Sequence, residues 1–391
     1  MSTAAIPARG FPEKEYAERT RRAQELLASS RVDAMLLNTE PEVRYFSGFH
    51  TQFWESPSRP WFLVVPREGK PIAVIPEIGV AGMQQTWLED IRSWPAPRPE
   101  DDGVSLVSRL LCDICKVHGR LGMPMGHETN LRMPLTDFHR LRDATGHIDL
   151  VDGSDIIHRL RSVKSEAEID KIRIACEVTS AGFEHLPTYA STGQTEREIC
   201  KQFRIDLLRR GADTSPYLIG ASGYGGYDNI IMGPTDRTLH AGDVLIIDTG
   251  TTYDGYFCDF DRNFSFGDTT DGARRAYDVV FRATEAGIDK ARPGVTHAQL
   301  YEAMWAILEQ GGALGNAVGR LGHGLGMQLT EGASNMPGDD TVLAPGMVLT
   351  IEPGMTFVPG KMMVHEENIV IRDGPAELLS RRAAPELPCM G

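Results

Sequence analysis

Apolar and polar residues alternate with two periods in the first part of the chain. Apolar positions recur about every 3.6 residues over residues 13–30 and 104–118, which indicates two amphipathic helices. Short apolar runs bounded by Pro and Gly predict strands at residues 32–38, 61–66 and 71–76. Helices and strands that alternate in this way predict a small α/β domain.

The pattern changes near residue 159. Ser165 and Glu168 form a capping box at the start of a long apolar-periodic segment. We therefore divide the chain into domains of residues 1–158 and 159–391. Long helices and strand–turn–strand segments in the second domain predict an α+β fold with a curved sheet. We expect helices at 165–188, 194–210, 271–290 and 297–310, and strands at 244–264, 347–353 and 362–372.

Length, charge and cysteine usage restrict the class of protein. A chain of 391 residues is long enough for two domains, and 41% hydrophobic with 24% charged residues is ordinary for a globular protein. The formal net charge of -14 argues against nucleic acid or an anionic membrane surface as the main partner. No apolar run is long enough to span a membrane, and the N-terminus lacks the apolar core of a secretory signal.

The six cysteines do not form the pattern of a disulfide framework. Cys112 and Cys115 have the spacing of half a metal or redox site. No second pair follows, and the surrounding sequence has helical periodicity, so we interpret both as helix residues. Together with the absence of a signal sequence, this cysteine usage predicts a cytoplasmic protein.

Carboxylates converge at the segment "VLIIDTGTTYDGYFCDFDRNF". If Asp254 and Gly255 form a two-residue turn, paired residues across the hairpin sum to 509. Asp248 then lies opposite Asp261, and Asp259 shares their face. Like charges this close destabilise a sheet unless a cation or protons compensate. The alternative is a solvated hairpin tip, which fits poorly with an apolar run that leads directly into Asp248. Gly250 would leave room for a ligand beside the carboxylates.

Further metal-binding residue types follow. His323 lies between two glycines in "GHGLGM", Glu352 ends the strand "GMVLTIEPG", and Glu366 and Glu367 lie in "HEENIVI". A mixed set of carboxylates and one imidazole suits divalent Mn, Co, Fe or Zn. Bridging carboxylates suit a site with two metal ions that activates a water. A lone histidine more often has a structural role. The five residues can form a metal site only if the fold brings them close together.

These motifs resemble those of the pita-bread metallohydrolases, the M24 peptidase superfamily. That superfamily includes Xaa-Pro aminopeptidases, prolidases and methionine aminopeptidases, with creatinase as a metal-free relative. "GDVLIIDTG", "CDFDR", "GHGLGM", "PGMVLTIEPG" and "HEENIVI" occur in the family's order and approximate spacing. "NTEPEVRYFSGF" also resembles the creatinase/prolidase N-terminal domain. The resemblance implies a C-terminal pita-bread catalytic domain preceded by a smaller creatinase-like α/β domain.

The resemblance also implies roles for individual residues. Asp248 would chelate one metal ion and Asp259 would bridge two. His323 and Glu352 would hold the second ion, and Glu352 would also relay a proton to or from the nucleophilic water. Glu366 would be the second bridging carboxylate. These implied ligands define a site for two divalent metal ions.

One assignment conflicts with residue counting. A two-residue turn at Pro359 and Gly360 would place Glu367 rather than Glu366 on the face of Glu352. The family pattern instead selects Glu366. We therefore infer that this hairpin contains a bulge or a longer loop.

The chain departs from the family where substrate is recognised. Xaa-Pro peptidases usually have a histidine seven residues after the metal-binding histidine, where this chain has Thr330. A second histidine is missing from the segment "DNIIMGPTDR", and the nearby His240 fits the turn before a strand. Val364 replaces a frequent arginine, and Asp261 replaces a usual threonine. These changes remove much of the peptide-recognition apparatus and leave all five implied ligands.

Other residues are candidates for substrate binding. Trp54 and Arg59 in the first domain combine aromatic surface with a cation, which suits a carboxylate or a cationic headgroup. The resemblance implies a homodimer in which this domain reaches the partner's active site. Tyr224 and Tyr227 are further candidates in a Gly/Tyr-rich loop. The structural alternative is that Trp61 is strand core, Arg59 a surface charge and the tyrosine loop a simple turn.

Three functional hypotheses remain. The first is a two-metal hydrolase that cleaves the C–N bond of a small amide by metal-activated water, as an Xaa-Pro dipeptidase or aminopeptidase. The second is a non-peptidase hydrolase or lyase on the same scaffold, acting on a modified amino acid or an osmolyte, because the substrate-binding histidines are missing. The third is a catalytically idle binding protein, against which the retention of all five ligands argues.

Overall fold

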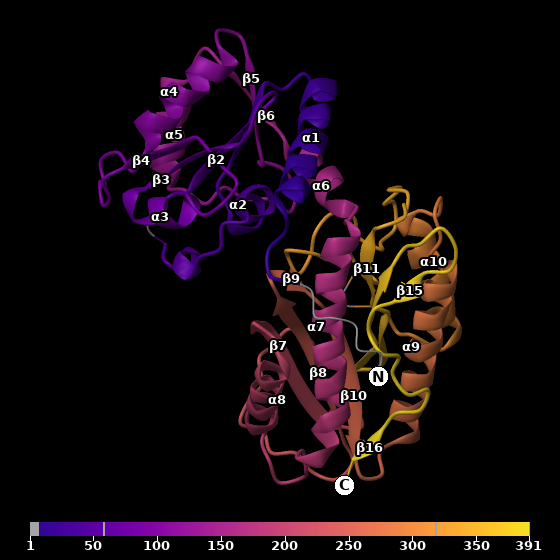
Figure 1. The fold of residues 1–391 in the computed structure, drawn as a ribbon. Helices are drawn as coiled ribbons and strands as arrows, with labels where there is room; N and C mark the ends of the chain where they lie inside the picture. Colours follow the sequence, from indigo (N-terminus) through magenta and orange to yellow (C-terminus); the bar gives the residue numbers. More distant parts are fainter. Residues whose placement is uncertain (1–7, 58, 317–318, 391) are drawn as a thin grey trace. The chain divides into compact units, whose positions relative to one another are not determined.

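The chain forms two compact units, Ala8–Leu160 and Arg161–Gly391. The structure is a computed structural model that describes residues 8–57, 59–316 and 319–390, and Figure 1 colours both units along the sequence. Within these described ranges, no helix combines the length and apolar character needed to cross a membrane.

The N-terminal unit is built on a six-stranded mixed sheet in the order β4-β3-β2-β1-β5-β6. Strands β1, β2 and β3 pair antiparallel, and the other neighbours pair parallel. Side chains of α4 and α5 pack on one face and form a core with it. The strands are β1 (Ala34–Leu37), β2 (Phe62–Pro66), β3 (Ile72–Pro76), β4 (Ile91–Trp94), β5 (Arg120–Met123) and β6 (Asp149–Asp152); the helices are α1 (Glu13–Ser30), α2 (Glu40–Ser47), α3 (Val80–Met83), α4 (Val104–Cys115) and α5 (Leu135–Ala144), with α6 (Ser154–Ser162) at the boundary between the units.

The two cysteines of the "CDIC" spacing lie on α4, as the helical periodicity predicts. Cys115 is buried in the core, Cys112 is half-buried, and both are free thiols. The helix ends at Cys115, three residues before the predicted end, because Lys116 adopts a positive φ of 56°. The structural interpretation of this spacing is therefore confirmed.

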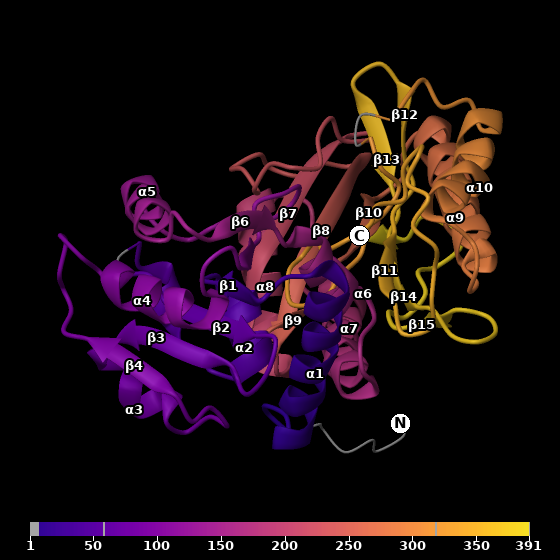
Figure 2. The same cartoon turned by 90° about the horizontal axis from the view of Figure 1, so that it is seen from above.

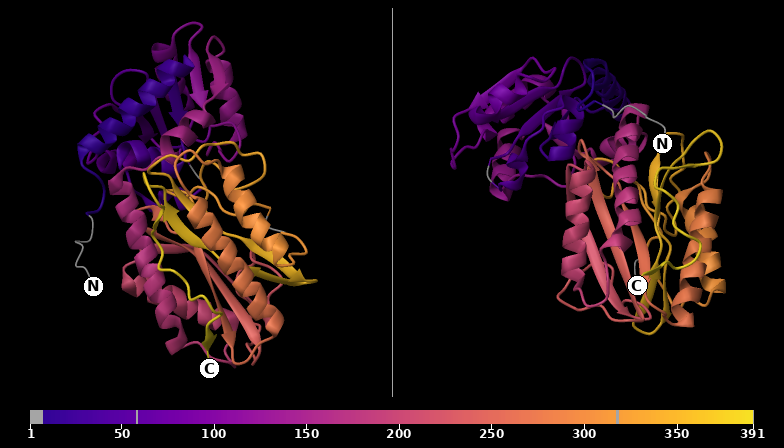
Figure 3. Two further views of the ribbon diagram at one scale, coloured as in Figure 1. Left: turned by 90° about the vertical axis from the view of Figure 1, so that its right-hand side faces the viewer. Right: turned by 60° about the horizontal axis from the view of Figure 1, so that its bottom comes forward.

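The C-terminal unit contains two sheets and one hairpin. One sheet has the order β16-β10-β8-β7 with β9 paired to β8, another has the order β11-β14-β15, and β12 pairs with β13. Helices α7 and α8 pack against the first sheet, and α9 and α10 lie beside the β11–β13 strands (Figures 2 and 3). The strands are β7 (Thr214–Tyr224), β8 (Asp243–Tyr253), β9 (Tyr256–Phe257), β10 (Phe260–Phe266), β11 (Val348–Ile351), β12 (Gly354–Val358), β13 (Lys361–Val364), β14 (Glu367–Val370), β15 (Glu377–Leu378) and β16 (Cys389–Met390); the helices are α7 (Glu166–His185), α8 (Glu196–Arg210), α9 (Asp271–Lys290) and α10 (His297–Gln310).

Three of the long helices begin with a capping box. Ser165 and Glu168 exchange hydrogen bonds at the start of α7, as the sequence predicts. The same reciprocal contacts occur at the starts of α8 and α10. Each box satisfies two backbone N–H groups that a helix start otherwise leaves without a partner. These local contacts explain why the predicted helices begin within two residues of the observed ones.

The β8–β10 hairpin has the register obtained by counting. Asp254 and Gly255 have φ values of 49° and 80°, which a two-residue turn of the primed type requires. Asp248 pairs with Asp261, and every described pair from there to the turn keeps the same sum. The returning strand is interrupted at Asp259, which lies between β9 and β10. The hairpin prediction is confirmed.

The β12–β13 hairpin contains the inferred bulge. Val358 pairs with Lys361 around the Pro359–Gly360 turn, but Thr356 pairs with Met362, so the register shifts by one residue. One additional residue on β12 therefore reverses which side chains of the following segment face the site. This shift places Glu366, and not Glu367, in register with Glu352.

Candidate metal centre

Three predicted ligands from distant parts of the chain meet in the C-terminal unit. Asp259, His323 and Glu366 each offer a ligand atom, and these atoms all lie within 4.8 Å of one another. All three residues are at least 96% buried. Asp259 comes from the β9–β10 junction, His323 from the loop before β11, and Glu366 from the β13–β14 junction. Segments next to both sheets of this unit thus meet at one cluster.

The imidazole of His323 is oriented for coordination. Its Nδ1 lies 2.9 Å from the carbonyl oxygen of Gly324, which can only accept, so Nδ1 carries the proton. Burial and then Arg320 lower the pKa of His323 to about 3, so the ring is neutral at ordinary pH. Its Nε2 lies 3.5 Å from Oδ2 of Asp259. Two lone-pair acceptors thus face each other, an arrangement that a shared cation satisfies.

Asp248 and Glu352 extend the negative charge around this cluster. Burial raises the pKa of Asp248 to about 6, and burial together with Asp248 raises the pKa of Glu352 to about 8. Burial, followed by the charges of neighbouring carboxylates, also raises the pKa values of Asp259 and Glu366. Four acidic groups therefore resist ionisation as long as nothing compensates their charge.

Two carboxylate oxygens of the candidate ligands have no hydrogen-bond partner among the described residues. They are Oδ1 of Asp248 and Oε1 of Glu366, and both are buried. A buried acceptor without a donor costs free energy, and such atoms are rare in folded proteins. With the facing acceptors of His323 and Asp259, they form an oxygen-rich donor set with one nitrogen. The residues present fit divalent metal ions.

The structure adds supporting residues that the sequence analysis missed. Tyr217 Oη donates to Oδ2 of Asp248 at 3.0 Å, and burial and Asp248 raise the tyrosine pKa, so it stays a donor. Asn368 accepts from the Asp259 N–H at 2.9 Å and donates back to its carbonyl oxygen. These contacts fix the direction of two candidate ligands. The alternation of apolar residues along β7 could have predicted a strand that carries Tyr217, although Pro216 interrupts this pattern.

Glu367 has a structural role beside the cluster. Its carboxylate is fully buried and accepts from Arg262 and Arg382, both at 2.9 Å. Burial opposes ionisation of Glu367, but Arg262, His365 and Arg382 together lower its pKa to about 2. Arg262 also donates to the carbonyl oxygen of Glu366 at 2.9 Å. This ion-pair network thus holds the neighbouring glutamate in place.

Asp261 and Tyr227 are buried next to the donor set. Asp261 is 1% exposed and its Oδ1 accepts from Asn263 at 3.3 Å. Tyr227 is also 1% exposed; its hydroxyl donates to Asn263 at 3.0 Å and accepts from the Val364 N–H at 2.8 Å. Tyr227 thus orients the amide that contacts Asp261. Its ring is buried, and the residue contributes with Tyr224 to the lining of one cavity, so its role in substrate binding stays a prediction.

The structure bears on two further expectations about this region. Tyr224 is 64% exposed, and strand alternation places it on the face of β7 opposite to the residue paired with Asp248. It therefore lies away from the donor set. The space above Gly250 is filled by protein, because a Cβ there would lie 2.4 Å from the Leu329 side chain. Gly250 allows close packing of this leucine rather than leaving room for a ligand.

Thr330 lies near the cluster and contacts a cation. Its hydroxyl accepts a hydrogen bond of 2.9 Å from Arg320. Both side chains are half-buried. The sequence analysis did not identify Arg320. The available signal was its position in "GRLGH", three residues before the predicted ligand His323. The histidine expected at position 330 from family patterns is thus replaced by a hydroxyl that holds a guanidinium.

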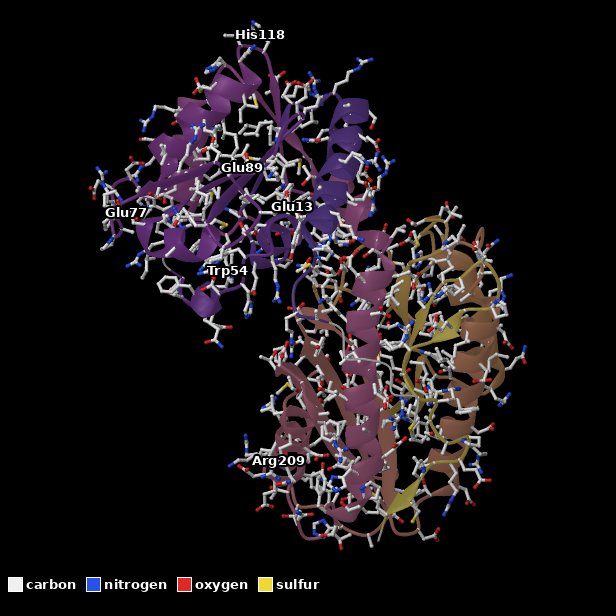
Figure 4. The ribbon with its side chains drawn as sticks, viewed as in Figure 1. Glu13, Trp54, Glu77, Glu89, His118 and Arg209 are labelled. Carbon is white, nitrogen blue, oxygen red and sulfur yellow. The ribbon has the colours of Figure 1, made fainter. Side chains whose placement is uncertain are left out.

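Trp54 and Arg59 belong to the N-terminal unit (Trp54 is labelled in Figure 4). The centroid of the Trp54 ring lies 5.9 Å from that of Trp61. The Arg132 guanidinium lies 5.3 Å from the centroid of the Trp54 ring. Arg59 has a positive φ of 63° and lies 5.6 Å from the ring of Phe53. Trp61 is 2% exposed, as expected for strand core. These contacts describe an aromatic–cation cluster within this unit.

The donor set, held by two sheets of an α+β unit, defines a metal-dependent hydrolase with a pita-bread catalytic domain. Comparison of the sequence with protein-family models agrees. Residues 170–373 match "Metallopeptidase family M24", and residues 19–163 match "Creatinase/Prolidase N-terminal domain". The chain belongs to the metallopeptidase family M24, and this membership implies divalent metal ions.

Individual relatives cover nearly the whole chain. A probable dipeptidase PepE of Mycobacterium tuberculosis is 30% identical over 365 residues, 93% of either chain. An Xaa-Pro dipeptidase of Lactobacillus delbrueckii subsp. lactis is 27% identical over 90% of this chain and 94% of its own. Among solved structures, a prolidase from Thermococcus sibiricus has a TM-score of 0.86 at 25% identity and covers 96% of this chain and 99% of its own. These similarities confirm the creatinase-like two-domain architecture.

Proposed function

We propose that this protein is a dinuclear metal-dependent hydrolase that cleaves the amide bond of Xaa-Pro dipeptides. The observation that carries the proposal is the meeting of Asp259, His323 and Glu366, in which buried acceptors face one another. Relatives named dipeptidase and Xaa-Pro dipeptidase, which match at least nine tenths of the chain, support the substrate class.

Asp248, Asp259, His323, Glu352 and Glu366 would hold two divalent ions, drawn from Mn, Co, Fe and Zn. When bound, the ions would supply Lewis acidity that activates a water and polarises the amide carbonyl. The chain's own residues prepare the site for this chemistry.

Glu352 is the residue we assign to proton transfer. It is partly exposed, whereas the three cluster residues are almost fully buried. Its carboxylate would take a proton from the nucleophilic water and deliver it to the leaving nitrogen. Tyr217 and Asn368 keep Asp248 and Asp259 oriented during the reaction.

A second function has one observation in its favour. Thr330 occupies the position where Xaa-Pro peptidases usually have a histidine, and its hydroxyl is bound to Arg320. A hydrolase or lyase of a modified amino acid or osmolyte would not need that histidine. The two functions share the metal centre and differ in substrate.

Metal analysis followed by a substrate panel tests this proposal. We expect the purified protein to bind Mn or Co and to hydrolyse Xaa-Pro dipeptides, and Asp259→Ala to lose both properties. Asp236→Ala is the matched control, because Asp236 is 80% exposed and pairs with Arg197 at the surface. Bound metal with inert dipeptides would favour the second function. No metal uptake, with Asp259→Ala indistinguishable from the wild type, would refute both.

We also propose a cytoplasmic homodimer in which Trp54 and Arg59 approach the substrate of the partner subunit. The aromatic–cation cluster around Trp54 supports such a role chemically. Light scattering at micromolar concentration measures the oligomeric state. A monomer with full dipeptidase activity would contradict this arrangement.

A further inference from the structure

The backbone carbonyl of Gly324 serves two donors from separate parts of one loop. Its oxygen lies 2.9 Å from Nδ1 of His323, and it also accepts the backbone N–H of Glu331 at 2.9 Å. The N–H of Gly324 in turn donates to the carbonyl oxygen of Ala333 at 3.0 Å. The acceptor that directs the imidazole is therefore held in place by the segment that contains Glu331.

The side chain of Glu331 belongs to a buried ion pair. Its Oε2 lies 3.0 Å from Nε of Arg161, and both residues are at most 7% exposed. Lys164 is buried beside them. Burial opposes ionisation of Glu331, but the charges of Arg161 and then of Lys164 lower its pKa. The carboxylate is held firmly, because separating it from these cations would leave buried charges without a partner.

The two cations lie on the segment that leads into α7. The backbone N–H of Lys164 donates to the carbonyl oxygen of Gly346 at 3.0 Å. The next residue, Ser165, forms the capping box that fixes the start of this 20-residue helix. Through Arg161 and Lys164, the carboxylate of Glu331 thus connects the histidine loop to the beginning of a long helix.

A glycine makes room for this carboxylate. A Cβ at Gly326 would lie 1.9 Å from Oε1 of Glu331 and 3.0 Å from Cε of Lys164. Gly326 does not have the positive φ that favours glycine, so an alanine there would meet this contact and not backbone strain. Any larger residue at position 326 would have to push the carboxylate away from its cations.

We propose that Glu331 is a positioning residue that fixes the tautomer and direction of the His323 imidazole through the carbonyl of Gly324. This inference rests on the proposed metal centre, in which Nε2 of His323 would bind an ion. A carbonyl that accepts from Nδ1 leaves Nε2 as the acceptor nitrogen. Groups that orient a metal-binding imidazole in this way change metal affinity by about tenfold to 100-fold when they are altered.

Three variants separate this role from a purely structural one. Glu331→Gln removes the charge, and Gly326→Ala keeps the charge but displaces the carboxylate. Asp254→Asn is the matched control, because it removes the charge of another buried ion pair of the same unit, formed with Lys171. All three variants are expected to melt at a lower temperature than the wild type, so stability alone does not distinguish them.

The first measurement is the tautomer of His323 in the metal-free protein. Nitrogen chemical shifts of isotope-labelled histidine report which ring nitrogen carries the proton, and His323→Gln identifies the resonance. We expect an unprotonated Nε2 in the wild type and in Asp254→Asn. A mixture of tautomers is expected in Glu331→Gln and in Gly326→Ala, because the acceptor of Nδ1 is no longer fixed.

The second measurement is calorimetric titration with manganese chloride. The Kd is expected to rise about tenfold or more in Glu331→Gln and Gly326→Ala, and by less than about twofold in Asp254→Asn. An unchanged tautomer in Glu331→Gln would overturn the inference, even with a changed Kd, because the effect would then bypass the imidazole. A changed tautomer in Asp254→Asn would also overturn it, as a general response to lost stability.

Two further outcomes keep the inference separate from the proposed function. If the wild type binds no manganese, the proposed function fails, and the tautomer in the metal-free variants still decides whether Glu331 positions His323. If neither Glu331→Gln nor Gly326→Ala melts cooperatively, Glu331→Asp decides, since it keeps the charge on a shorter side chain. A wild-type tautomer and Kd in Glu331→Asp would then refute the inference, and a mixed tautomer would support it.

Discussion

Asp248 lies directly opposite Asp261 in the pairing of β8 with β10, so two buried carboxylates leave the same face of one sheet. Like charges in this relation destabilise neighbouring strands. The structure places this repulsion beside the residues that would hold divalent ions. The arrangement of carboxylates that suits metal ions thus lowers the stability of the metal-free protein.

Neutralising one member of this pair should stabilise the metal-free protein. We expect Asp261→Asn to raise the free energy of unfolding by about 1 kcal/mol at pH 8, because the amide removes the repulsion and still accepts from Asn263. Urea unfolding of the metal-free protein measures the effect. The exposed Asp236→Asn should change stability by less than half as much. A destabilised Asp261→Asn variant would show that its charge is already compensated.

The adjacent glutamates should respond in opposite ways. Glu366→Gln is expected to reduce metal content sharply with little loss of stability, because it removes a candidate ligand that has an unpaired oxygen. Glu367→Gln is expected to cost about 3 kcal/mol, because Arg262 and Arg382 lose a buried partner. Elemental analysis and denaturant unfolding of both variants check this. Metal loss confined to Glu367→Gln would reverse the assignment.

Stability of the metal-free protein should fall as pH rises. The pKa values of Asp248 and Glu352 are about 6 and about 8 in the fold, above the unfolded values of about 4. Between these limits the folded state binds more protons than the unfolded state, so rising pH favours unfolding until about pH 8. Melting temperatures measured from pH 5 to 9 should show this decline, and added Mn should reverse it. A metal-free protein that gains stability across this interval would contradict the raised pKa values.

Gly322 should be required for the position of His323. Its φ is 127°, and a Cβ there would lie 2.2 Å from the carbonyl oxygen of Thr350, which belongs to the backbone and cannot move aside cheaply. We expect Gly322→Ala to destabilise the protein by more than about 2 kcal/mol and to weaken metal binding. Gly233→Ala is the control, since a Cβ there meets no atom within 4 Å. Equal melting temperatures for the two variants would exclude this strain.

The sequence predicted the helices and the β8–β10 hairpin because local chemistry determines them. The box at Ser165 and Glu168 and the turn at Asp254 and Gly255 are encoded within a few residues. Strand β7 was not predicted, since Pro216 and the glycines in it weaken the strand signal. The segment becomes a strand because it pairs with β8. Pairing between separate segments is not visible in a local sequence pattern.

The candidate ligands came from family motifs, and counting alone would have chosen Glu367. The bulge before Val358 places Glu366 in register with Glu352 instead. No residue type in the sequence indicates this bulge. The contacts of Tyr217 and Arg320 escaped prediction for a different reason. Both join side chains that lie on separate segments, so they exist only after the sheets and loops have assembled.

The last candidate ligand in the sequence, Glu366, lies between β13 and β14, which pair with β12 and β11. A nascent chain that stops before this segment has no complete donor set, whatever its other helices and strands have formed. Metal uptake during synthesis should therefore begin only when β13 and β14 have paired with their partners. It would depend on this pairing rather than assist the first steps of folding.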